Sequence, residues 1–538
     1  MNLSSYKNTK NAAEKPSYYS IRCEILFGIN MYPNQPVVVT VNSDLHNQGE
    51  KSTHDLSSEI EVDEALARKM ELVNNAIDEI GFTSYQMKLF FLNGFGYAVD
   101  SLLILLNALT QPQVALQYKP VVSKAQTISV GVGLLFGALF WGLGADVIGR
   151  KYAFNITLLW CAVFATVAGA SPSYIFVCVF IALMAFGGGG NLILDTAVYL
   201  EFLPSKYQWS LTFMACWWGV GQMIAGLVAW PFLANYSCKA DEVCTNANNS
   251  GWRYTFYTLG SFVFLLSLLR MLVIRLKESP KWLLSQNRDE EVVKIIGEIA
   301  HSAGKQNPLT IEQLQEIGPI TALSDFKKYD LTVIFHHIKG LFPNAKVTYS
   351  TLLNIASWAL IGLAYPLYNV FLPYYLQSRG ASMGDGSTYT TYRDYAIVNV
   401  CSIFGPIIAG GLVEVRFLGR RYTMVIGALL TMTFLFLYTI VRTPAQNLAF
   451  SCVISVCLNI YYGTLYAYTP EVLPSAHRGT GNAITVACNR IMGIVAALVG
   501  TYADLSSSVP IYVCAASFGA LALFSFLFPF EPRGSRSG

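Results

Sequence analysis

Glu201-Phe202-Leu203-Pro204-Ser205 recurs later in the chain as Glu471-Val472-Leu473-Pro474-Ser475. A second motif, Gly149-Arg150-Lys151, recurs as Gly419-Arg420-Arg421, and the two pairs are separated by the same number of residues. One short match arises easily by chance, but two at a single spacing indicate a chain built from two like halves. Each motif follows a long apolar run at a corresponding place in its half. Parallel repeats of six membrane helices, with a solute site between them, are a common plan among secondary transporters.

The composition also indicates a membrane protein. Of 538 residues, 53% are hydrophobic and 13% are charged, whereas a soluble domain carries about 25% charged residues. Apolar runs of roughly 20 residues, the length that crosses a bilayer as a helix, occur repeatedly. The net charge of +3 is small and gives no nucleic-acid footprint. The polar N-terminus shows no cleavable signal peptide. We therefore predict an all-α, multi-pass membrane protein with no nucleic-acid partner.

Twelve apolar spans predict twelve transmembrane helices in two pseudo-symmetric six-helix halves. The spans cover approximately 89–110, 125–145, 152–170, 173–198, 210–234, 254–275, 350–376, 394–415, 422–441, 446–468, 481–502 and 508–529. The predicted parts are a cytosolic N-terminal tail (1–85), an N-terminal half (86–276), a cytosolic connector (277–349), a C-terminal half (350–530) and a cytosolic C-terminal tail (531–538). Within the first tail, Asp63 to Ile80 has helical spacing, which fits a helix lying on the membrane or one packed on neighbouring loops.

Basic residues between the spans set the orientation. They fall on one side if the spans alternate, and they include Arg150, Lys151, Lys206, Arg416, Arg420, Arg421 and Arg478. By the positive-inside rule that side is the cytosol, with both termini inside. The opposite side receives a loop with Cys238 and Cys244, which form a disulfide or stay free; a disulfide fits an oxidising exterior or lumen. The same loop holds glycosylation sequons at Asn235 and Asn248. We expect the plasma membrane first and a vacuolar or vesicular membrane second.

Gly142 to Lys151, with the sequence GLGADVIGRK, resembles the signature loop of the major facilitator superfamily. Tyr468 to Gly479 is similar to the sugar-porter pattern after the tenth helix, and Glu278 to Leu283 is similar to that family's motif after the sixth. The resemblance covers nearly all of residues 86–531 and implies the major facilitator fold. It also implies cytosolic networks of charge that latch one conformation, formed by Asp146, Arg150, Lys151, Glu201, Glu278, Glu414, Arg420, Arg421, Glu471 and Arg478.

The sugar-binding signature itself is not matched. Leu183 stands where sugar porters carry an arginine in helix four, and span seven lacks their paired glutamines. The glycine run Gly187 to Asn191, and the stretch Tyr85 to Phe91 that leads to Asp100, resemble the synaptic-vesicle-glycoprotein-2-like branch and its fungal relatives. That branch includes proton-driven carriers of small organic ions. No strand precedes the glycine run and no lysine follows it, so close helix packing is its expected role rather than phosphate binding.

Ionisable side chains at bilayer depth are costly, which makes them functional candidates. We predict that Asp100 in span one and Asp195 in span four couple protons; the structural alternatives are a carboxylate capping a broken helix and helix-pairing hydrogen bonds. Arg490 in span eleven either binds an anionic group of the solute or neutralises Asp100 or Asp195. The neutral amides predicted to bind substrate are Asn93, Asn191, Gln222 and Asn369. Aromatic residues are plentiful, notably Trp217, Trp218, Trp358, Tyr365 and Tyr368, and only those near mid-span are further candidates, because aromatics at helix ends usually mark the membrane interface.

These features predict proton-coupled secondary active transport of a small polar organic solute by alternating access, carried out by a monomer in the lipid bilayer. Two alternatives stay open: a transporter-like receptor or scaffold without turnover, and a proton antiporter that exports metabolites or drugs. The sequence contains no nucleotide-binding loop, metal-ligand cluster or nucleophile constellation, so we expect no cofactor, no bound metal and no enzyme activity. His336-His337 is an adjacent pair, which cannot face one metal as an i, i+4 pair could.

Overall fold

The computed structural model describes residues 64–122, 124–238, 243–272, 276–320, 335, 337–378, 388–474, 477–502 and 509–533. Within its helices, the side chains of residues 145–148, 369–378, 388, 500–502 and 510 are outside the described set. Every regular element in the described ranges is a helix.

The N-terminal half contains six spans. They are α3 (Ser84–Tyr118), α4 (Ala125–Ile148), α5 (Arg150–Gly169), α6 (Tyr174–Glu201), a fifth span made of η1 (Ser205–Tyr207), α7 (Trp209–Met214) and α8 (Cys216–Asn235), and α9 (Gly251–Leu272).

The C-terminal half repeats this plan. Its helices are α14 (Ala345–Ser378), α15 (Thr388–Ser402) with α16 (Phe404–Leu412), α17 (Gly419–Leu437) with η2 (Tyr438–Ile440), α18 (Pro444–Val472), α19 (Arg478–Tyr502) and α20 (Val509–Leu527). Among the described residues, eleven helices are long and apolar enough to cross a membrane, and Ile511–Leu527 is a shorter apolar helix. The predicted all-α membrane fold is confirmed.

Several helices begin before the apolar runs that predict them, and α3 and α14 are two of these. The structure begins α3 at Ser84 and α14 at Ala345, several residues before the apolar runs. Both first turns are polar, so hydropathy does not detect them, but side-chain caps fix them as helix. Thr83 and Gln86 form a capping box at the start of α3. The Asn344 side chain accepts a hydrogen bond from the amide of Val347 at 2.9 Å.

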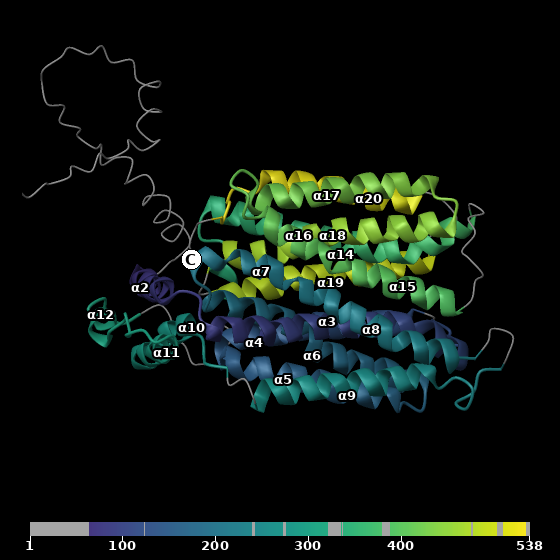
Figure 1. The fold of residues 1–538 in the computed structure, drawn as a ribbon, viewed down its shortest axis with the longest axis horizontal. Coiled ribbons are helices and arrows are strands. Elements are labelled where there is room, and N and C mark those ends of the chain that lie inside the picture. The colour runs from purple at the N-terminus through teal and green to yellow at the C-terminus, as the bar shows by residue number, and fades with distance from the viewer. Residues whose placement is uncertain are drawn as a thin grey trace, which may run out of the picture. The chain divides into compact units, whose positions relative to one another are not determined.

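The two halves meet along two pairs of helices, α4 with α19 and α8 with α15 (Figure 1). Glycines permit close approach in both pairs: Gly142 of α4 faces Ala483 of α19, and Gly226 of α8 faces Ala396 of α15. A further link joins α15 to the far end of α3, where the Tyr392 hydroxyl donates to the Leu109 carbonyl at 3.0 Å. The interior between the halves is therefore bounded by helices of both repeats.

The glycine run of α6 packs against two helices at once. A Cβ at Gly187 would lie 2.8 Å from the Thr157 carbonyl of α5, and one at Gly189 would lie 2.7 Å from the Ala138 amide of α4. Both distances are shorter than real Cβ contacts, so larger residues would push the helices apart. Close helix packing accounts for this run, as the absence of a preceding strand suggested.

Helix α2 (Glu64–Ile80) packs on the connector helices α10 (Pro280–Ser285) and α11 (Asp289–Ser302), and α12 (Ile311–Gln315) packs on α11 (Figure 1). Lys69 of α2 is buried and pairs with Asp289 at 2.6 Å. Asp78 accepts hydrogen bonds from the amide and hydroxyl of Ser205 at 2.7 and 2.8 Å. Of the two interpretations of this segment, packing on neighbouring loops is the one observed, and it ties the N-terminal segment to the first repeated motif.

Candidate functional site

A carboxylate and a guanidinium face each other across the two halves. Asp100, near the middle of α3, is 1% exposed, and Arg490 of α19 approaches it with Nη2 3.7 Å from Oδ2. That separation is an ion pair but too long for a hydrogen bond. Neither oxygen of Asp100 has a hydrogen-bond partner among the described residues. The sequence left open whether Arg490 neutralises Asp100 or Asp195. In the structure it lies beside Asp100, and the two side chains interact through their charges without a hydrogen bond between them.

The second predicted carboxylate, Asp195, has a different partner. Arg270 of α9 donates from Nη2 to Asp195 Oδ1 at 2.7 Å, and both side chains are almost completely buried. The Arg270 guanidinium also lies over the ring of Phe154. Arg270 was not predicted as a site residue, although an arginine near the end of an otherwise apolar span was the signal that could have found it.

Asp100 and Asp195 lie close to each other along α3. The Asp195 carboxylate occupies the space that a side chain at Gly96 would need, and Gly188 of α6 lies opposite Asp100. Gly96 and Asp100 are one turn apart, about 6 Å of helix rise. The two carboxylates therefore follow one another along the α3–α6 contact. Asp100 faces the other half, whereas Asp195 pairs within its own half.

The three predicted amides whose side chains the structure describes are all buried, on α3, α6 and α8. Asn93 turns back to donate to the Leu89 carbonyl at 2.7 Å. Asn191 accepts a hydrogen bond from Thr157 at 2.7 Å, which joins α6 to α5 inside the N-terminal half. Gln222 is buried on α8. The side chain of Asn369 lies outside the described residues.

Six aromatic rings gather next to the Asp100–Arg490 pair and are here called the aromatic cluster. They are Tyr97, Trp218, Trp358, Tyr365, Tyr462 and Tyr466. Tyr97 lies one turn before Asp100 on α3. On the other side, Asn489, the residue before Arg490, donates to the Trp358 carbonyl at 3.0 Å. Trp218, Trp358 and Tyr365 are among the aromatics noted in the sequence, whereas the tyrosines of α3 and α18 were missed because nothing local separates them from core aromatics.

Each half carries a buried ion pair at its repeated motifs, and the end of the spans where these pairs lie is here called the motif end. Arg150 pairs with Glu201 in the first half. In the second half, Arg420 binds Glu471 through two hydrogen bonds of 3.0 and 2.9 Å. Arg478 is also buried, and the side chain of Asp146 lies outside the described residues. The sequence repeat thus corresponds to a structural repeat, because each half has a buried arginine–glutamate pair at the same place.

A second carboxylate completes each motif by capping a helix. Glu278 Oε1 accepts hydrogen bonds from the amides of Arg150 and Lys151 at 3.1 and 3.4 Å. Glu531 does the same for Arg420 and Arg421 at 2.9 and 3.0 Å. The glycines before both helices have positive φ, 103° at Gly149 and 58° at Gly419, which lets each carboxylate reach the helix N-terminus.

The helix of the second motif is capped by a residue from far along the chain. Glu414, a predicted latch residue, lies before the motif and is exposed. Glu531, assigned only to the C-terminal tail, caps α17 instead. The Arg533 guanidinium donates to the Glu414 carbonyl oxygen at 2.6 Å, so Arg533 lies against this loop.

Replacing Glu531 by glutamine should lower the free energy of unfolding by about 1 kcal/mol, because a charge that accepts two helix N-terminal hydrogen bonds is lost. Glu414→Gln is the matched control and should change stability by no more than about 0.5 kcal/mol. Unfolding in mixed micelles measures both. Equal losses for the two variants would contradict the assignment of the cap to Glu531.

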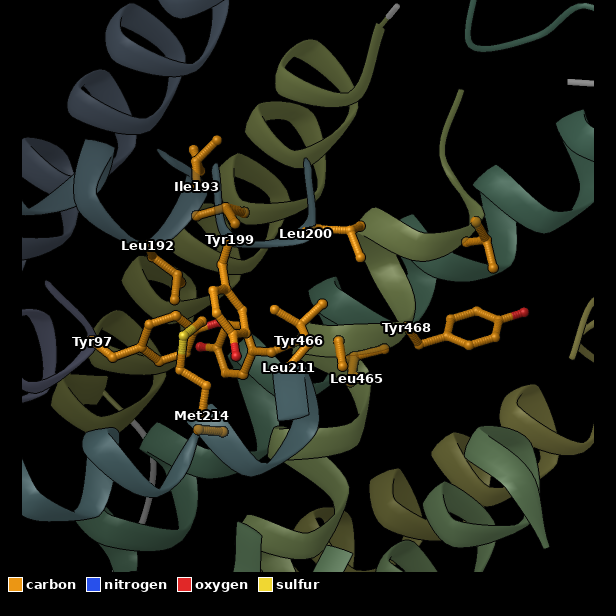
Figure 2. Packing of buried hydrophobic residues seen from close by; sticks show 14 of the residues in the cluster. Tyr97, Leu192, Ile193, Tyr199, Leu200, Leu211, Met214, Leu465, Tyr466 and Tyr468 are labelled. Atoms are coloured by element: carbon orange, nitrogen blue, oxygen red, sulfur yellow. The ribbon is translucent and has the colours of Figure 1, made fainter. Parts of the chain in front are cut away.

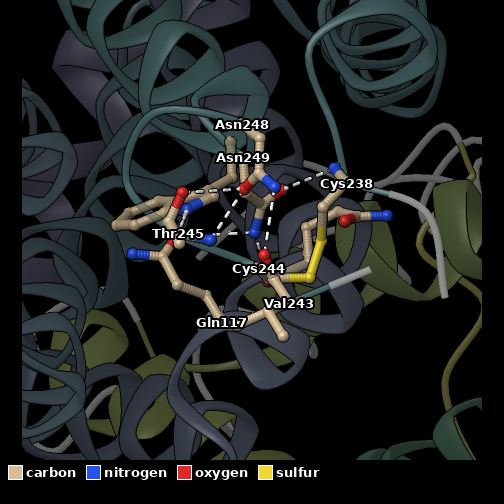
Figure 3. The surroundings of a disulfide bond; sticks show 9 residues. Gln117, Cys238, Val243, Cys244, Thr245, Asn248 and Asn249 are labelled. Atoms are coloured by element: carbon tan, nitrogen blue, oxygen red, sulfur yellow. Dashed lines mark hydrogen bonds between the residues drawn. A yellow bond between two sulfur atoms is a disulfide. The ribbon is translucent and has the colours of Figure 1, made fainter. Parts of the chain in front are cut away.

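At the opposite end of the spans, Cys238 and Cys244 form a disulfide (Figure 3). Asn249 fastens this loop to α3 by donating to the Gln113 carbonyl at 2.9 Å. Both sequon asparagines, Asn235 and Asn248, are exposed. Asn248 accepts a hydrogen bond from the Thr245 amide at 2.7 Å. In the described part of the chain no three His, Cys, Asp or Glu side chains are grouped to hold a metal ion.

The Major Facilitator Superfamily model matches residues 89–497 and 361–537 of the chain. The MFS-type transporter PB1E7.08c of Schizosaccharomyces pombe is 42% identical over 519 residues, which cover 91% of this chain and 93% of that protein. The MFS siderochrome iron transporter 1 of Ceriporiopsis subvermispora is 40% identical and covers 88% and 93%. The svop-1 protein of Caenorhabditis elegans is 24% identical and covers 87% of each chain.

Among solved structures, the fold is similar to that of the proton:xylose symporter XylE bound to 6-bromo-6-deoxy-D-glucose. The TM-score is 0.64 at 16% sequence identity, and the match covers 84% of this chain and 98% of XylE. At this identity the likeness concerns the fold alone.

Proposed function

The chain belongs to the major facilitator superfamily, and on that premise we propose that it is a proton-coupled secondary transporter, which moves a small polar organic solute by alternating access. It is an integral, multi-pass membrane protein whose relatives are membrane transporters. The predicted likeness to sugar porters and to the synaptic-vesicle-glycoprotein-2-like branch agrees with the matches to XylE and svop-1.

The Asp100–Arg490 pair is the observation that carries this proposal. Its two members come from different halves, so a motion that separates the halves also changes the distance between the charges. Charges away from water are costly unless paired, and this pair has no hydrogen bond to reinforce it. A proton on Asp100 removes one of the two charges and leaves Arg490 without its counter-ion.

Release of Arg490 provides a binding partner for an anionic group of the solute. A guanidinium stays charged at physiological pH and holds a carboxylate in a forked geometry. One proton and one anion that enter together leave the net charge of the site unchanged, so the coupled step is electroneutral. Asp195 keeps its own counter-ion, Arg270, and we assign this second pair to holding α6 against α9.

The ion pairs at the motif end support movement of the halves as rigid bodies. Arg150–Glu201 joins α5 to α6, and Arg420–Glu471 joins α17 to α18, so each pair lies within one half. Breaking a buried pair costs several kcal/mol. The interfaces between α4 and α19 and between α8 and α15 are therefore where the halves rock, with the Asp100–Arg490 pair between them.

Purified protein in vesicles that contain a pH-sensitive dye tests the function. The solute panel includes xylose and a ferric siderochrome, which the names of XylE and of the Ceriporiopsis relative suggest, together with simple carboxylates. We expect one solute to carry protons across the membrane only when the protein is present, with no dependence on membrane potential. Solute flux without protons would contradict the coupling, and no flux from folded protein would favour the receptor reading.

The same vesicles decide the direction of transport, since a proton-binding aspartate serves uptake and export alike. Solute and protons that move together identify a symporter, whereas opposite movement identifies the exporter. We propose the plasma membrane as the location, with a vacuolar or vesicular membrane as the alternative, and imaging of a fluorescent fusion tests it.

A further inference from the structure

The aromatic cluster has a geometry suited to a flat ring. Tyr466 lies at its centre, with ring centroids 5.7 Å from Tyr462, 5.8 Å from Trp218 and 4.8 Å from Trp358. The Tyr462 and Tyr466 rings are nearly parallel, at 20° to each other. Trp358 meets Tyr466 edge-on, at 81°. Parallel and edge-on contacts are the two arrangements that aromatic rings prefer, so the cluster already has the surfaces that a conjugated ring would contact.

The cluster draws on both halves of the protein. Tyr97 of α3 lies 6.2 Å from Tyr466 of α18, and Figure 2 shows these two rings next to each other among the buried residues. Trp218 comes from α8 of the first half, whereas Trp358 and Tyr365 come from α14 of the second. Tyr365 and Tyr462 meet edge-on at 5.9 Å. A ring bound here would touch both halves, as alternating access requires of a transported solute.

Buried polar groups without partners lie beside these rings. The hydroxyl of Tyr97 is completely buried and has no hydrogen-bond partner among the described residues. The same holds for both carboxylate oxygens of Asp100, one turn further along α3, and for Nε of Arg490. Buried donors and acceptors normally form hydrogen bonds, and a buried polar group without a hydrogen-bond partner is unfavourable. Their concentration next to the cluster indicates a place where a ligand's polar groups bind.

We propose that the solute is a flat, conjugated ring that carries a carboxylate. The ring stacks within the aromatic cluster against Tyr466, and the carboxylate binds Arg490 once a proton has neutralised Asp100. This assignment rests on the proposed transport function and adds the chemical class of the solute to it. No bond is made or broken: one proton joins Asp100 as the anion binds and leaves it as the anion departs.

The charges of the site distinguish this class from two others that aromatic rings also bind. A sugar can lie on aromatic faces, but it has no charge to match Arg490 when Asp100 is protonated. An organic cation is attracted to aromatic faces, but the guanidinium at the edge of the cluster repels it. A planar anion satisfies both the rings and the arginine.

Equilibrium binding to the purified full-length protein in lipid nanodiscs tests the proposal with four labelled probes. Benzoate is planar and anionic. Cyclohexanecarboxylate has the same charge but a puckered ring, benzamide has the planar ring without the charge, and trimethylanilinium has the ring with a positive charge. We expect benzoate to bind about tenfold more tightly than each of the other three, from stacking and from the charged hydrogen bonds.

Variants connect that preference to named residues. Tyr466→Leu should lower benzoate affinity about tenfold and abolish the preference over cyclohexanecarboxylate, whereas Tyr466→Phe should retain both. Arg490→Lys should reduce the preference over benzamide, because the forked geometry is lost. Tyr512→Leu, at an exposed ring outside the cluster, is the matched control and should bind like the wild type.

Each contrary result overturns a stated part of the proposal. If cyclohexanecarboxylate binds as tightly as benzoate, the solute need not have a planar ring. If benzamide binds as tightly as benzoate, the solute need not be an anion. If trimethylanilinium binds most tightly, the site prefers a cation. If none of the four binds but another solute drives protons into the vesicles, the solute class is wrong and the transport function stands. If benzoate shows the expected binding preference but no solute moves protons, the coupling is wrong and the solute class stands.

Discussion

Asp100→Asn is expected to abolish accumulation driven by a pH gradient while solute exchange across the membrane continues. One proton that moves with one anion across a gradient of one pH unit can support an accumulation of about tenfold, since a pH unit corresponds to about 1.4 kcal/mol. Asparagine is neutral at every pH, so Arg490 is always free to bind the anion, and no proton is carried. The accumulation ratio should therefore fall from about 10 towards about 1.

The control for this variant is Asp394→Asn. Asp394 pairs with its neighbour Arg393 on α15, and both side chains are partly exposed. Such pairs contribute little to stability, so accumulation should stay at the wild-type level. The measurement is labelled solute inside vesicles at several imposed pH gradients, with exchange measured at zero gradient. Full accumulation by Asp100→Asn would remove Asp100 from the coupling step.

The largest effect on stability is expected from Arg270→Met. This change leaves Asp195 buried without its counter-ion, at a place where its second oxygen already faces the backbone of Gly96. Removing one member of a buried pair typically costs about 3–5 kcal/mol, because the remaining charge stays desolvated and unpaired. The free energy of unfolding in mixed micelles, and the amount of folded protein recovered from membranes, measure the loss.

The double variant Arg270→Met/Asp195→Leu separates a structural role from a coupling role. Replacing a whole buried pair by apolar residues is often neutral or stabilising, so most of the lost stability should return. Arg393→Met, at a partly exposed pair, is the control and should cost no more than about 1 kcal/mol. If the double variant is stable but no longer accumulates solute on a pH gradient, Asp195 takes part in coupling after all.

The spans and motifs could be predicted because they are local properties of the chain. A bilayer requires a minimum run of apolar residues, so α6 and α18 are visible as runs. A buried ion pair at the motif end requires the same few residues in each half, so Arg150 with Glu201 repeats as Arg420 with Glu471. Helix starts were less accurate, since the first turns of α3 and α14 are polar and are fixed by caps that hydropathy does not measure.

The partners of the charged residues could not be predicted in the same way. The sequence was compatible with three roles for Arg490, namely binding an anionic solute, neutralising Asp100 and neutralising Asp195. No role was predicted for Arg270. Glu531 was assigned to a tail although it caps α17, because contact between residues so far apart in the chain follows no local pattern. The aromatic cluster is similar: Tyr97, Tyr462 and Tyr466 come from two helices in different halves, and each alone resembles an ordinary core residue.

The amino-acid sequence alone predicts a two-fold repeat of six apolar spans, charged motifs at one end of them, and acidic and basic residues within them. The folded structure adds that Asp195 pairs with Arg270, that Asp100 and Arg490 meet between the halves, and that aromatic rings lie next to this meeting point. The two kinds of information differ because hydropathy and motif chemistry are carried by neighbouring residues. Which side chains face one another depends instead on how closely the helices cross and on how each helix is rotated. Contacts such as that of Gly96 with Asp195 set these distances and rotations, and they exist only in the folded protein.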